Sequence, residues 1–293
     1  LKHRLNEDEL DKIARDTVAL KQQQESQEDI SCLPTLQLSD IPPEIQTVTP
    51  SDRYPQAPAI CYDQPTAGIF YFSSVFGSGH LDESLVPLVP FFCHAFTKIG
   101  TASNDYVQMA RRIDRYTGGV GMAVQARTRF DDRGSCLPLV SFNGKCLNRN
   151  QEEMFAIVQE LLFKMDFCDH ARLKTLLLEY RAALEAMVIQ NGHRLAISLA
   201  SRNFSPAGAL AEAWHGVHQL QTIKGLSDSL NADAMAAIAD DLRAIGRRLL
   251  VAGNLKLALV GEAPAIDAGV AEAQDVFLAM ISQSQLRSPI PRK

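Results

Sequence analysis

Residues 120–129 read Val-Gly-Met-Ala-Val-Gln-Ala-Arg-Thr-Arg, and this stretch decides the fold class. Two sets of side chains alternate along it, a period of two that predicts a half-buried strand. The Asp-Asp-Arg-Gly sequence at 131–134 supplies turn chemistry, and residues 137–147 then return as a second strand. The sequence therefore predicts an antiparallel hairpin near the middle of the chain.

Further strands are predicted on both sides of this hairpin. Aromatic and β-branched runs at 59–62 and 68–72 are separated by Asp-Gln-Pro-Thr at 63–66, which indicates two strands and a turn. Residues 255–260, Leu-Lys-Leu-Ala-Leu-Val, predict a final strand. We expect these strands to belong to one sheet.

Helical periodicity dominates the rest of the chain. Residues 84–99 are apolar almost all round, which predicts a buried helix with Pro87 and Pro90 in its first turns. Other helices are predicted from Asn104 to Tyr116, after Asn150, from Asp169, at 193–203, at 206–214 and at 232–250. Strands followed by helices, with hairpin connections, predict an α+β fold: an antiparallel β-sheet packed against several α-helices.

The two ends of the chain have a different character. Residues 5–29 are amphipathic and rich in acids, which predicts a solvated helix that needs a partner, as in half of a helical hairpin. A proline-rich stretch follows. We therefore predict the end of a hairpin linker at 1–32, an α+β domain at 33–263 and a connector toward a missing final domain at 264–293. Because the chain opens without Met, we expect an internal start.

Composition excludes several classes of protein. Of the 293 residues, 46% are apolar and 22% are charged, which is typical of a globular protein. The formal charge of −5, without a basic stripe, argues against nucleic acid as a partner. Apolar stretches are too short to cross a membrane, so we expect no membrane partner. Six widely spaced cysteines favour reduced thiols, and hence a reducing cytoplasm or organelle matrix.

Candidate metal ligands are sparse and poorly spaced. His215 and His218 have the i, i+3 spacing of a helical pair, but Gly216 lies between two predicted helical segments. Cys168 and His170 have the wrong separation for a zinc finger. Cys93 and His94 are neighbours, so they point in different directions on a helix. Core packing explains these residues better than metal binding does.

Candidates for nucleophilic catalysis are equally weak. The Gly-Ser-Gly-His sequence at 77–80 lacks the strand-to-helix pattern of a nucleophile elbow. Residues 117–121, Thr-Gly-Gly-Val-Gly, follow a helix and precede a strand, the reverse of a phosphate-binding loop, so helix termination is favoured. Glu152 and Glu153 at a helix start suit the helix dipole before they suit acid–base chemistry.

One stretch is more specific. Residues 33–42, Leu-Pro-Thr-Leu-Gln-Leu-Ser-Asp-Ile-Pro, resemble the entry into the C-terminal half of insulinase-like zinc peptidases of the presequence-protease and falcilysin branch. The resemblance covers residues 5 to about 260 in order. It continues in Tyr71-Phe72-Ser73, in Leu88-Val-Pro-Phe-Phe-Cys93, in Ile99-Gly-Thr101 with Tyr106, and in Tyr116-Thr-Gly-Gly119.

The resemblance implies a metallopeptidase LuxS/insulinase-like fold without a catalytic centre. In this family the first half carries His-x-x-Glu-His, in which two His bind zinc and Glu is the base. The register implied by the resemblance puts Phe91 and Ala95 at the ligand positions and His94 at the base. Phe and Ala cannot coordinate a metal. We therefore expect no catalytic, cofactor-binding or metal-binding residue in this chain, and zinc in the missing catalytic half.

The expected function follows from this degenerate motif. We expect a non-catalytic part of a zinc metallopeptidase that degrades peptides, inactive alone and forming part of the wall of a closed substrate chamber. The resemblance implies two partners, the N-terminal catalytic half of the same polypeptide and unfolded peptide substrates, and a mitochondrial-type matrix in a eukaryote. It also places an Arg and a Tyr that position substrate in a final domain beyond Lys293.

Two alternatives stay open. The chain could be a stand-alone module that binds an extended peptide along an exposed sheet edge, without an enzymatic role. It could also be an unrecognised enzyme that uses His215, His218 or a cysteine. Peptide titration discriminates the first alternative, and metal analysis discriminates the second.

Overall fold

A computed structural model describes residues 6–26, 33–45, 47–55, 59–132 and 134–283. Parts of the predicted linker and connector, and Cys32, lie outside these residues. The chain divides into two compact units, Leu1–Thr47 and Val48–Lys293, each described here by itself. The division into segments 1–32, 33–263 and 264–293 stays a prediction. No helix in the described part of the chain is long and apolar enough to cross a membrane.

The first unit contains helix α1, Glu7–Glu25, which confirms the helix predicted there. Its N-terminus is a capping box, in which Asn6 Oδ1 accepts the Glu9 N–H at 2.8 Å and the Glu9 carboxylate accepts the Asn6 N–H at 2.9 Å. Along its described length α1 buries no residue, and Ile13 and Val18 are half exposed. Its apolar stripe is uncovered within this unit.

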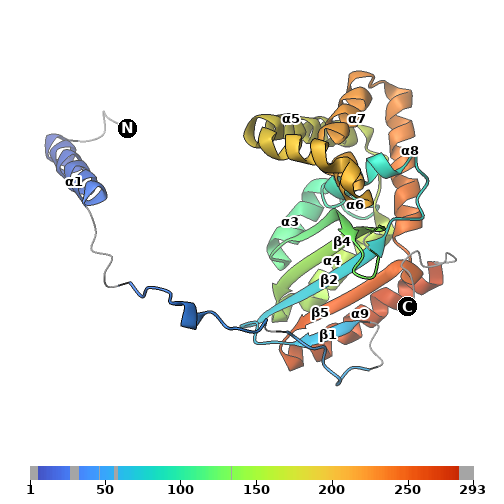
Figure 1. Ribbon diagram of the computed structural model, residues 1–293, viewed down its shortest axis with the longest axis horizontal. Coiled ribbons are helices and arrows are strands. Elements are labelled where there is room, and N and C mark those ends of the chain that lie inside the picture. The colour runs from blue at the N-terminus through green and yellow to red at the C-terminus, as the bar shows by residue number, and fades with distance from the viewer. Residues whose placement is uncertain (1–5, 27–32, 46, 56–58, 133, 284–293) are drawn as a thin grey trace. The chain divides into compact units, whose positions relative to one another are not determined.

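The second unit is built on one five-stranded sheet (Figure 1). The strands are β1 (Ile60–Asp63), β2 (Ile69–Gly77), β3 (Val120–Thr128), β4 (Cys136–Leu147) and β5 (Leu255–Gly261), in the spatial order β1-β5-β2-β4-β3. Strands β3 and β4 form the predicted hairpin, in which Val120 lies opposite Gly144 and Thr128 opposite Cys136. This hairpin makes β3 an edge strand.

The α+β class is confirmed, with one departure from the antiparallel sheet that the sequence predicts. Strand β5 lies between β1 and β2, antiparallel to β2 but parallel to β1, so the sheet is mixed. Consequently β1 and β2 are not a hairpin, although only residues 64–68 separate them. In the sequence β5 follows every α-helix of the described chain except α9, and such a long connection permits a parallel pair with β1.

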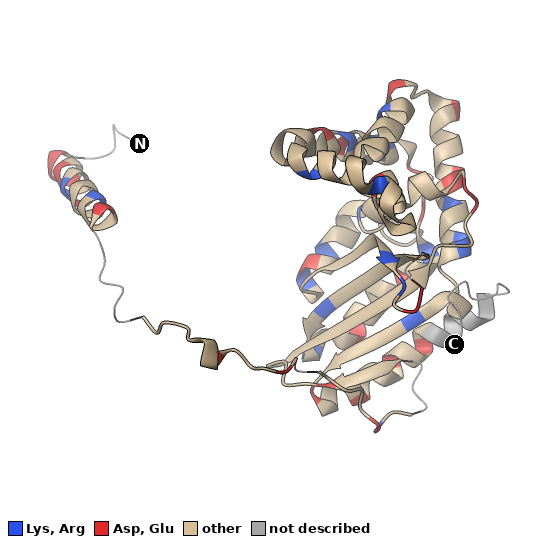
Figure 2. Ribbon diagram, viewed as in Figure 1, with Lys and Arg blue, Asp and Glu red and all other residues tan. Residues whose placement is uncertain are grey.

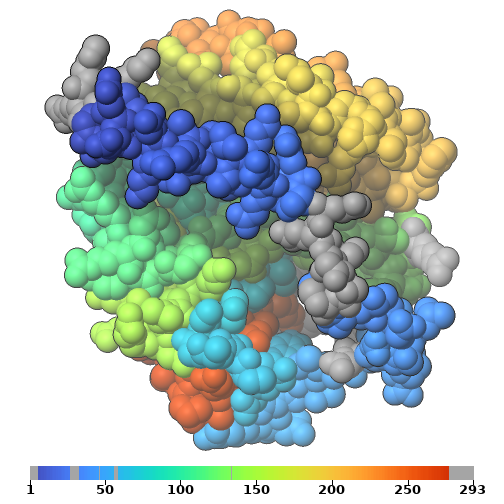
Figure 3. Space-filling model, turned by 90° about the vertical axis from the view of Figure 1, so that its left-hand side faces the viewer, coloured from blue at the N-terminus to red at the C-terminus, as the bar shows by residue number. Residues whose placement is uncertain are grey.

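Helices cover one face and one end of this sheet. Their bounds are α2 (Val89–Ala95), α3 (Tyr106–Tyr116), α4 (Gln151–Lys164), α5 (His170–Ser201), α6 (Pro206–His215), α7 (Val217–Asp228), α8 (Ala232–Leu249) and α9 (Ala263–Gln283). Helix α4 packs against β4 and α9 against β5, while α2 and α6 contact β3. Figures 1 and 3 both show α5, α6 and α7 gathered at one end of the unit.

Several boundaries differ from the prediction for identifiable reasons. Asp105, not Asn104, caps α3, because its Oδ1 accepts two N–H groups of the first turn while Asn104 donates to Glu160. The helix predicted at 193–203 is the end of α5, which continues through a kink at Asn191 (φ −132°, ψ 30°). The buried segment at 84–99 contains a shorter α-helix, α2, preceded by a 3₁₀ turn at Val86–Leu88.

The two faces of the sheet have opposite character. On β2, Phe70, Phe72 and Phe76 are buried against the helices, whereas Tyr71 and Ser73 alternate with them and are exposed. Strand β4 repeats this alternation, with Phe142 and Cys146 buried and Asn143 and Lys145 exposed. One sheet face therefore belongs to the core, and the other is open within this unit.

Candidate functional site

The degenerate metal motif lies on α2, in the middle of the core. Pro90 occupies its first turn, and Phe91 and Ala95, four residues apart on one face, are both fully buried. The Phe91 ring packs against Tyr180 of α5, with ring centroids 5.8 Å apart. Both positions that the resemblance predicts for the histidines of the family motif thus hold apolar side chains in the core.

His94 completes this cluster as a neutral side chain. Its ring centroid lies 4.8 Å from that of Tyr180, and Lys98 Nζ lies 3.3 Å from His94 Nε2. Burial, and then the charge of Lys98, lower the pKa of His94 from 6.5 to about 4. Burial also raises the pKa of Tyr180 to about 12, so its phenol keeps its proton. A phenyl ring, a methyl group and one imidazole do not fit a zinc ion.

The other candidate histidines, His215 and His218, do not belong to a cluster of side chains that could hold a metal ion. Within the described residues, no three His, Cys, Asp or Glu side chains are placed to share a metal ion. His215 ends α6, where burial lowers its pKa, and His218 Nδ1 lies 3.2 Å from Glu212 Oε1 in the first turn of α7. Gly216 lies between these helices, and a side chain there would clash, because its Cβ would lie 1.9 Å from the Glu212 carboxylate.

The cysteine candidates are not arranged as ligands either. Cys168 Sγ accepts from an Arg243 N–H at 3.4 Å, and His170 is the first residue of α5. Cys93 is buried, which raises the pKa of its thiol and keeps it protonated. The free cysteines among the described residues are Cys61, Cys93, Cys136, Cys146 and Cys168.

The Gly-Ser-Gly-His stretch at 77–80 is the segment in which the chain leaves the end of β2. Asn254 holds Gly77 from both sides, accepting its N–H at 2.9 Å and donating to its C=O at 2.8 Å. His80 Nε2 lies 2.9 Å from the Arg248 carbonyl oxygen. Glu152 and Glu153 lie in the first turn of α4, where their charge complements the helix dipole.

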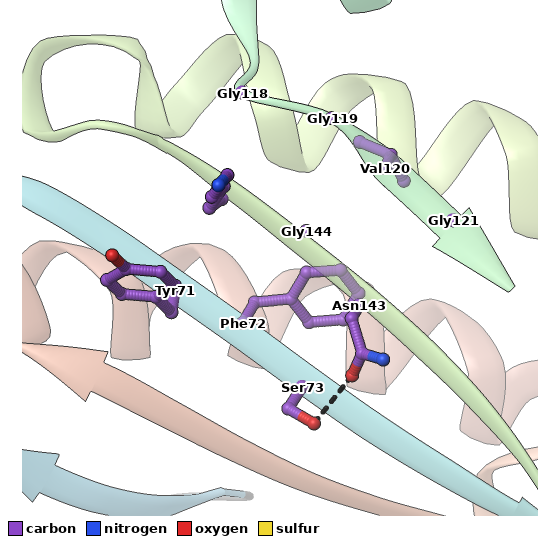
Figure 4. A pocket seen from close by; sticks show the side chains of 10 residues that line it. Tyr71, Phe72, Ser73, Gly118, Gly119, Val120, Gly121, Asn143 and Gly144 are labelled. Atoms are coloured by element: carbon purple, nitrogen blue, oxygen red, sulfur yellow. Dashed lines mark hydrogen bonds between the residues drawn. The ribbon is translucent and has the colours of Figure 1, made fainter. Parts of the chain in front are cut away.

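A hollow of 540 Å³ lies on the open face, over β2, β4 and the start of β3 (Figure 4). Its floor lacks side chains, because its lining contains the glycines Gly118, Gly119 and Gly121. Gly119 has a φ of 113°, a conformation that favours glycine as the chain leaves α3 for β3. The glycine run that terminates α3 therefore also opens a space on the sheet.

Side chains of β2 and β4 surround this floor. Figure 4 shows Tyr71 and Phe72 on β2 and, toward the other end, Ser73 beside Asn143 of β4. The Ser73 hydroxyl donates to Asn143 Oδ1 at 2.7 Å, so these polar groups satisfy each other. Lys145 is the charged residue of the lining. The hollow can hold a side chain, but its described lining contains no paired base and nucleophile.

Sequence reasoning missed Tyr71 and Lys145 as site residues. The sequence did contain a signal for these residues. Asn143 and Lys145 are polar positions in a strand whose alternate residues are apolar, and this strand pairs in a hairpin with the strand that starts within the 118–121 glycine run. What was missing was the pairing of Tyr71 with Lys145, which only the β2–β4 register gives.

Comparison with known proteins shows which family this chain resembles. The family of domains associated with subfamily C of the M16 peptidases matches residues 1–226. The mitochondrial presequence protease of Danio rerio is 31% identical over 237 residues, which cover 80% of this chain and 23% of that protein. Presequence protease 1 of Arabidopsis thaliana, named as chloroplastic/mitochondrial, is 30% identical over 85% of this chain and 23% of its own length. The chain thus spans about a quarter of these curated relatives.

Solved structures share the fold. A peptidase M16 inactive domain from Pseudomonas fluorescens superposes with a TM-score of 0.52 at 16% identity, covering 80% of this chain and 51% of that one. The periplasmic protease PqqL from Escherichia coli gives a TM-score of 0.54 at 14% identity, covering 80% of this chain and 24% of its own. At these identities the likeness concerns the fold alone.

The fold is that of an α+β domain of the kind found in M16 peptidases. The chain belongs to the family of domains associated with subfamily C of these peptidases, within the presequence-protease branch of the insulinase-like enzymes. The predicted family is confirmed. The assignment of no catalytic, cofactor or metal residue, including the roles given to Phe91, His94 and Ala95, stays a prediction.

Proposed function

We propose that this chain is a non-catalytic part of a zinc-dependent metallopeptidase that degrades peptides, and that it forms part of the wall of the closed substrate chamber. The observation that carries the proposal is the packing of Phe91 and Ala95 at the motif positions, both fully buried. A metal site cannot be regained there without emptying part of the core. Zinc and the base then belong to the N-terminal catalytic half of the same polypeptide.

Enclosure is the role that suits such a domain. A closed chamber excludes water and admits only substrates that fit inside, so an inert wall contributes selection by size. The open sheet face, with its hollow, is the surface of this unit that is free to line such a space. Unfolded peptides are the substrates expected, because a folded protein is too large to be enclosed.

The compartment is part of the proposal. The relatives carry mitochondrial or chloroplastic names, and we place this chain in an organelle matrix or the cytoplasm, in a reducing environment. Its described cysteines are all free thiols, and Cys61, Cys93 and Cys146 are buried. Such thiols suit a reducing compartment.

Complementation tests the proposal. Hydrolysis of an unstructured peptide is measured for the chain alone, for a separately produced N-terminal half alone, and for the mixture, with zinc content determined in each sample. We expect chelator-sensitive activity in the mixture and none in the chain alone. The matched control is an N-terminal half in which Gln replaces the Glu of its His-x-x-Glu-His motif. Stoichiometric zinc and activity in the chain alone would overturn the proposal.

A second candidate is a stand-alone peptide-binding module. It is supported by β3, which ends the sheet and turns every second pair of N–H and C=O groups away from β4. An extended peptide can add to such an edge as a further strand. Saturable peptide binding by the chain, with no gain of activity on mixing, would favour this candidate over the chamber wall.

A further inference from the structure

The hollow on the open sheet face carries charge of one sign. A second, smaller depression of 190 Å³ adjoins it, and the two share Gly118 and Lys145 in their linings. The smaller depression adds Arg115, at the end of α3, to the lining. Neither lining contains an acidic residue. Two cations therefore lie beside a space that is large enough for a peptide side chain.

The position of Lys145 depends on Gly118. A Cβ built at Gly118 would lie 3.1 Å from both Cγ and Cε of Lys145, so the lysine stem lies flat over this glycine. This contact directs the stem from β4 across the start of the edge strand. Among the described residues, no ion pair involves Lys145, and the Arg115 guanidinium lies 5.2 Å from the centroid of the Tyr116 ring.

An apolar surface adjoins this charge. Tyr71 is the cross-strand neighbour of Lys145, and it is 37% exposed. Directly opposed residues in an antiparallel pair have Cβ atoms about 5 Å apart. The ring of Tyr71, the glycine floor and the Lys145 ammonium thus form one surface with an apolar part and a cationic part.

The rest of the open face strengthens the charge. Although the chain carries a formal charge of −5, its five strands contain the basic residues Arg127, Lys145 and Lys256 and a single acid, Asp63 at the end of β1. Figure 2 shows basic residues, without Asp or Glu, on the central strands β4 and β5, and β2 between them carries no charged residue. A carboxylate approaching this face meets attraction from every charged strand residue near the hollow.

We propose that the hollow binds an extended peptide segment in which an apolar side chain is followed, two positions on, by Asp or Glu. The apolar side chain lies over the glycine floor against Tyr71, and the carboxylate pairs with Lys145, with Arg115 adding to the attraction. Alternate side chains of an extended chain point the same way, about 7 Å apart.

This inference rests on the proposed function only for its consequence. If the chain lines a substrate chamber, the hollow makes the enzyme hold peptides with neighbouring apolar and acidic residues longer than peptides without them. Binding to the chain itself is a separate question, and it is measured without any catalytic half. A failure of binding therefore leaves the complementation experiment untouched, and the converse also holds.

Fluorescence polarisation with short labelled peptides tests the proposal on the whole 293-residue chain. The peptides are unstructured, acetylated and amidated, and differ at two positions: Leu-Ser-Glu, Leu-Ser-Gln and Ala-Ser-Glu in a Gly/Ser background. We expect the Leu-Ser-Glu peptide to bind about fivefold more tightly than the Gln peptide, as for a partly exposed ion pair. The difference should shrink as salt is raised.

Substitutions in the chain test which residues cause these differences in peptide affinity. Lys145→Gln should abolish the preference for Glu over Gln, and Tyr71→Ala should abolish the preference for Leu over Ala. Lys256→Gln is the matched control and should cause a smaller loss of the preference for Glu, because Lys256 is an exposed lysine on the same face but lies opposite Val75 rather than Tyr71. Both lysines are exposed, so an unchanged thermal melting curve for each variant shows that folding is intact.

Three outcomes would overturn the proposal: equal affinity for the Glu and Gln peptides, an equal loss of preference in Lys145→Gln and Lys256→Gln, or no saturable binding at all. A final arm uses the Gln peptide with a free C-terminal carboxylate. Equal affinity of this peptide and the amidated Glu peptide would show capture of a chain end, and the assignment to an internal acidic residue would then be wrong.

Discussion

Two places in this domain differ in how they use space. At the motif position on α2, Phe91, His94 and Tyr180 fill the space with rings in van der Waals contact. At the hollow on the open face, glycines leave 540 Å³ unfilled beside an exposed tyrosine and lysine. The first place is filled by packed side chains, whereas the second is open and has an exposed charge beside it.

The filled position on α2 contributes to stability, whereas the open hollow does not. Filling the α2 position stabilises the fold, because buried aromatic side chains contribute several kcal/mol through apolar burial and contact. Leaving the hollow open does not stabilise the fold, because glycines in a strand cost conformational entropy and bury nothing. A feature that costs stability and exposes an aromatic ring is where binding should be sought.

The largest effect is expected at the filled position. Phe91→Ala should lower the free energy of unfolding by about 3–5 kcal/mol, because it leaves a cavity against Tyr180 that the surrounding core cannot close. Urea unfolding followed by circular dichroism measures this loss. Lys145→Gln, at the open place, should change the same quantity by less than about 0.5 kcal/mol. Similar values for both variants would remove the distinction between the two places.

A second test lies within the hollow itself. Gly144 faces the core rather than solvent, and a Cβ there would lie 3.1 Å from Phe72 Cδ1. Phe72 has little room to move, because its ring already contacts Phe142 and Phe155 at centroid distances of 5.1 and 6.2 Å. Gly144→Ala should therefore cost about 1–3 kcal/mol in the same urea experiment. A neutral result would mean that the core side of the floor is looser than its contacts indicate.

The filled position should also make stability depend on pH. The pKa of His94 is about 4 in the folded chain and about 6.5 when unfolded, so between these values the unfolded chain binds more protons. The contribution is present in full above pH 6.5 and is lost as the pH falls toward 4. After allowance for partial exposure we expect a loss of about 1–2 kcal/mol from His94.

Urea midpoints at pH 7.0, 6.0 and 5.0 measure this loss, and His94→Gln is the matched variant. The variant should be less sensitive to pH than the parent chain, with a remaining slope from His215, whose pKa burial also lowers. The charges of Lys98, Arg172 and Glu179 also act on the pKa of His94. An unchanged slope in His94→Gln would contradict a neutral, buried imidazole.

Local sequence patterns predicted the individual helices and strands, but not the order of the strands in the sheet. The period of two at 120–129 and the turn after it predicted β3 and β4, and the helices predicted at 206–214 and 232–250 correspond to α6 and α8. The insertion of β5 between β1 and β2 could not be predicted, because alternation in a strand says which face is buried and not which strand lies beside it.

The same limit applies to the site. Phe91 and Ala95 were found through resemblance to a motif, which is local in sequence, and the structure shows both side chains buried. The hollow joins Tyr71, Gly118 and Lys145 across three chain segments, and their proximity exists only in the register of the sheet. Residues 117–121 were interpreted as a helix terminator, which is correct for α3 and incomplete for the surface.

The smallest stability effect is expected at Gly121, and it is the sharpest test of the open place. Nothing lies within 4 Å of a Cβ built there, and its φ is not positive, so Gly121→Ala should leave the free energy of unfolding unchanged or raise it by about 0.5 kcal/mol. The same methyl group rises from the floor of the hollow. It should weaken binding of the Leu-Ser-Glu peptide by about threefold, since it occupies space needed by the apolar side chain.

Gly225→Ala is the matched control for this substitution. Gly225 lies in α7, a Cβ there also meets nothing within 4 Å, and it is not part of the hollow. It should raise stability by about 0.5–1 kcal/mol and leave peptide binding unchanged, because alanine is the better helix former. A methyl group that is harmless to the fold at both glycines but weakens binding only at Gly121 would show that the open space is used. Equal binding by both variants would show that a peptide does not enter the hollow, and the contrast with the α2 position would then be one of packing alone.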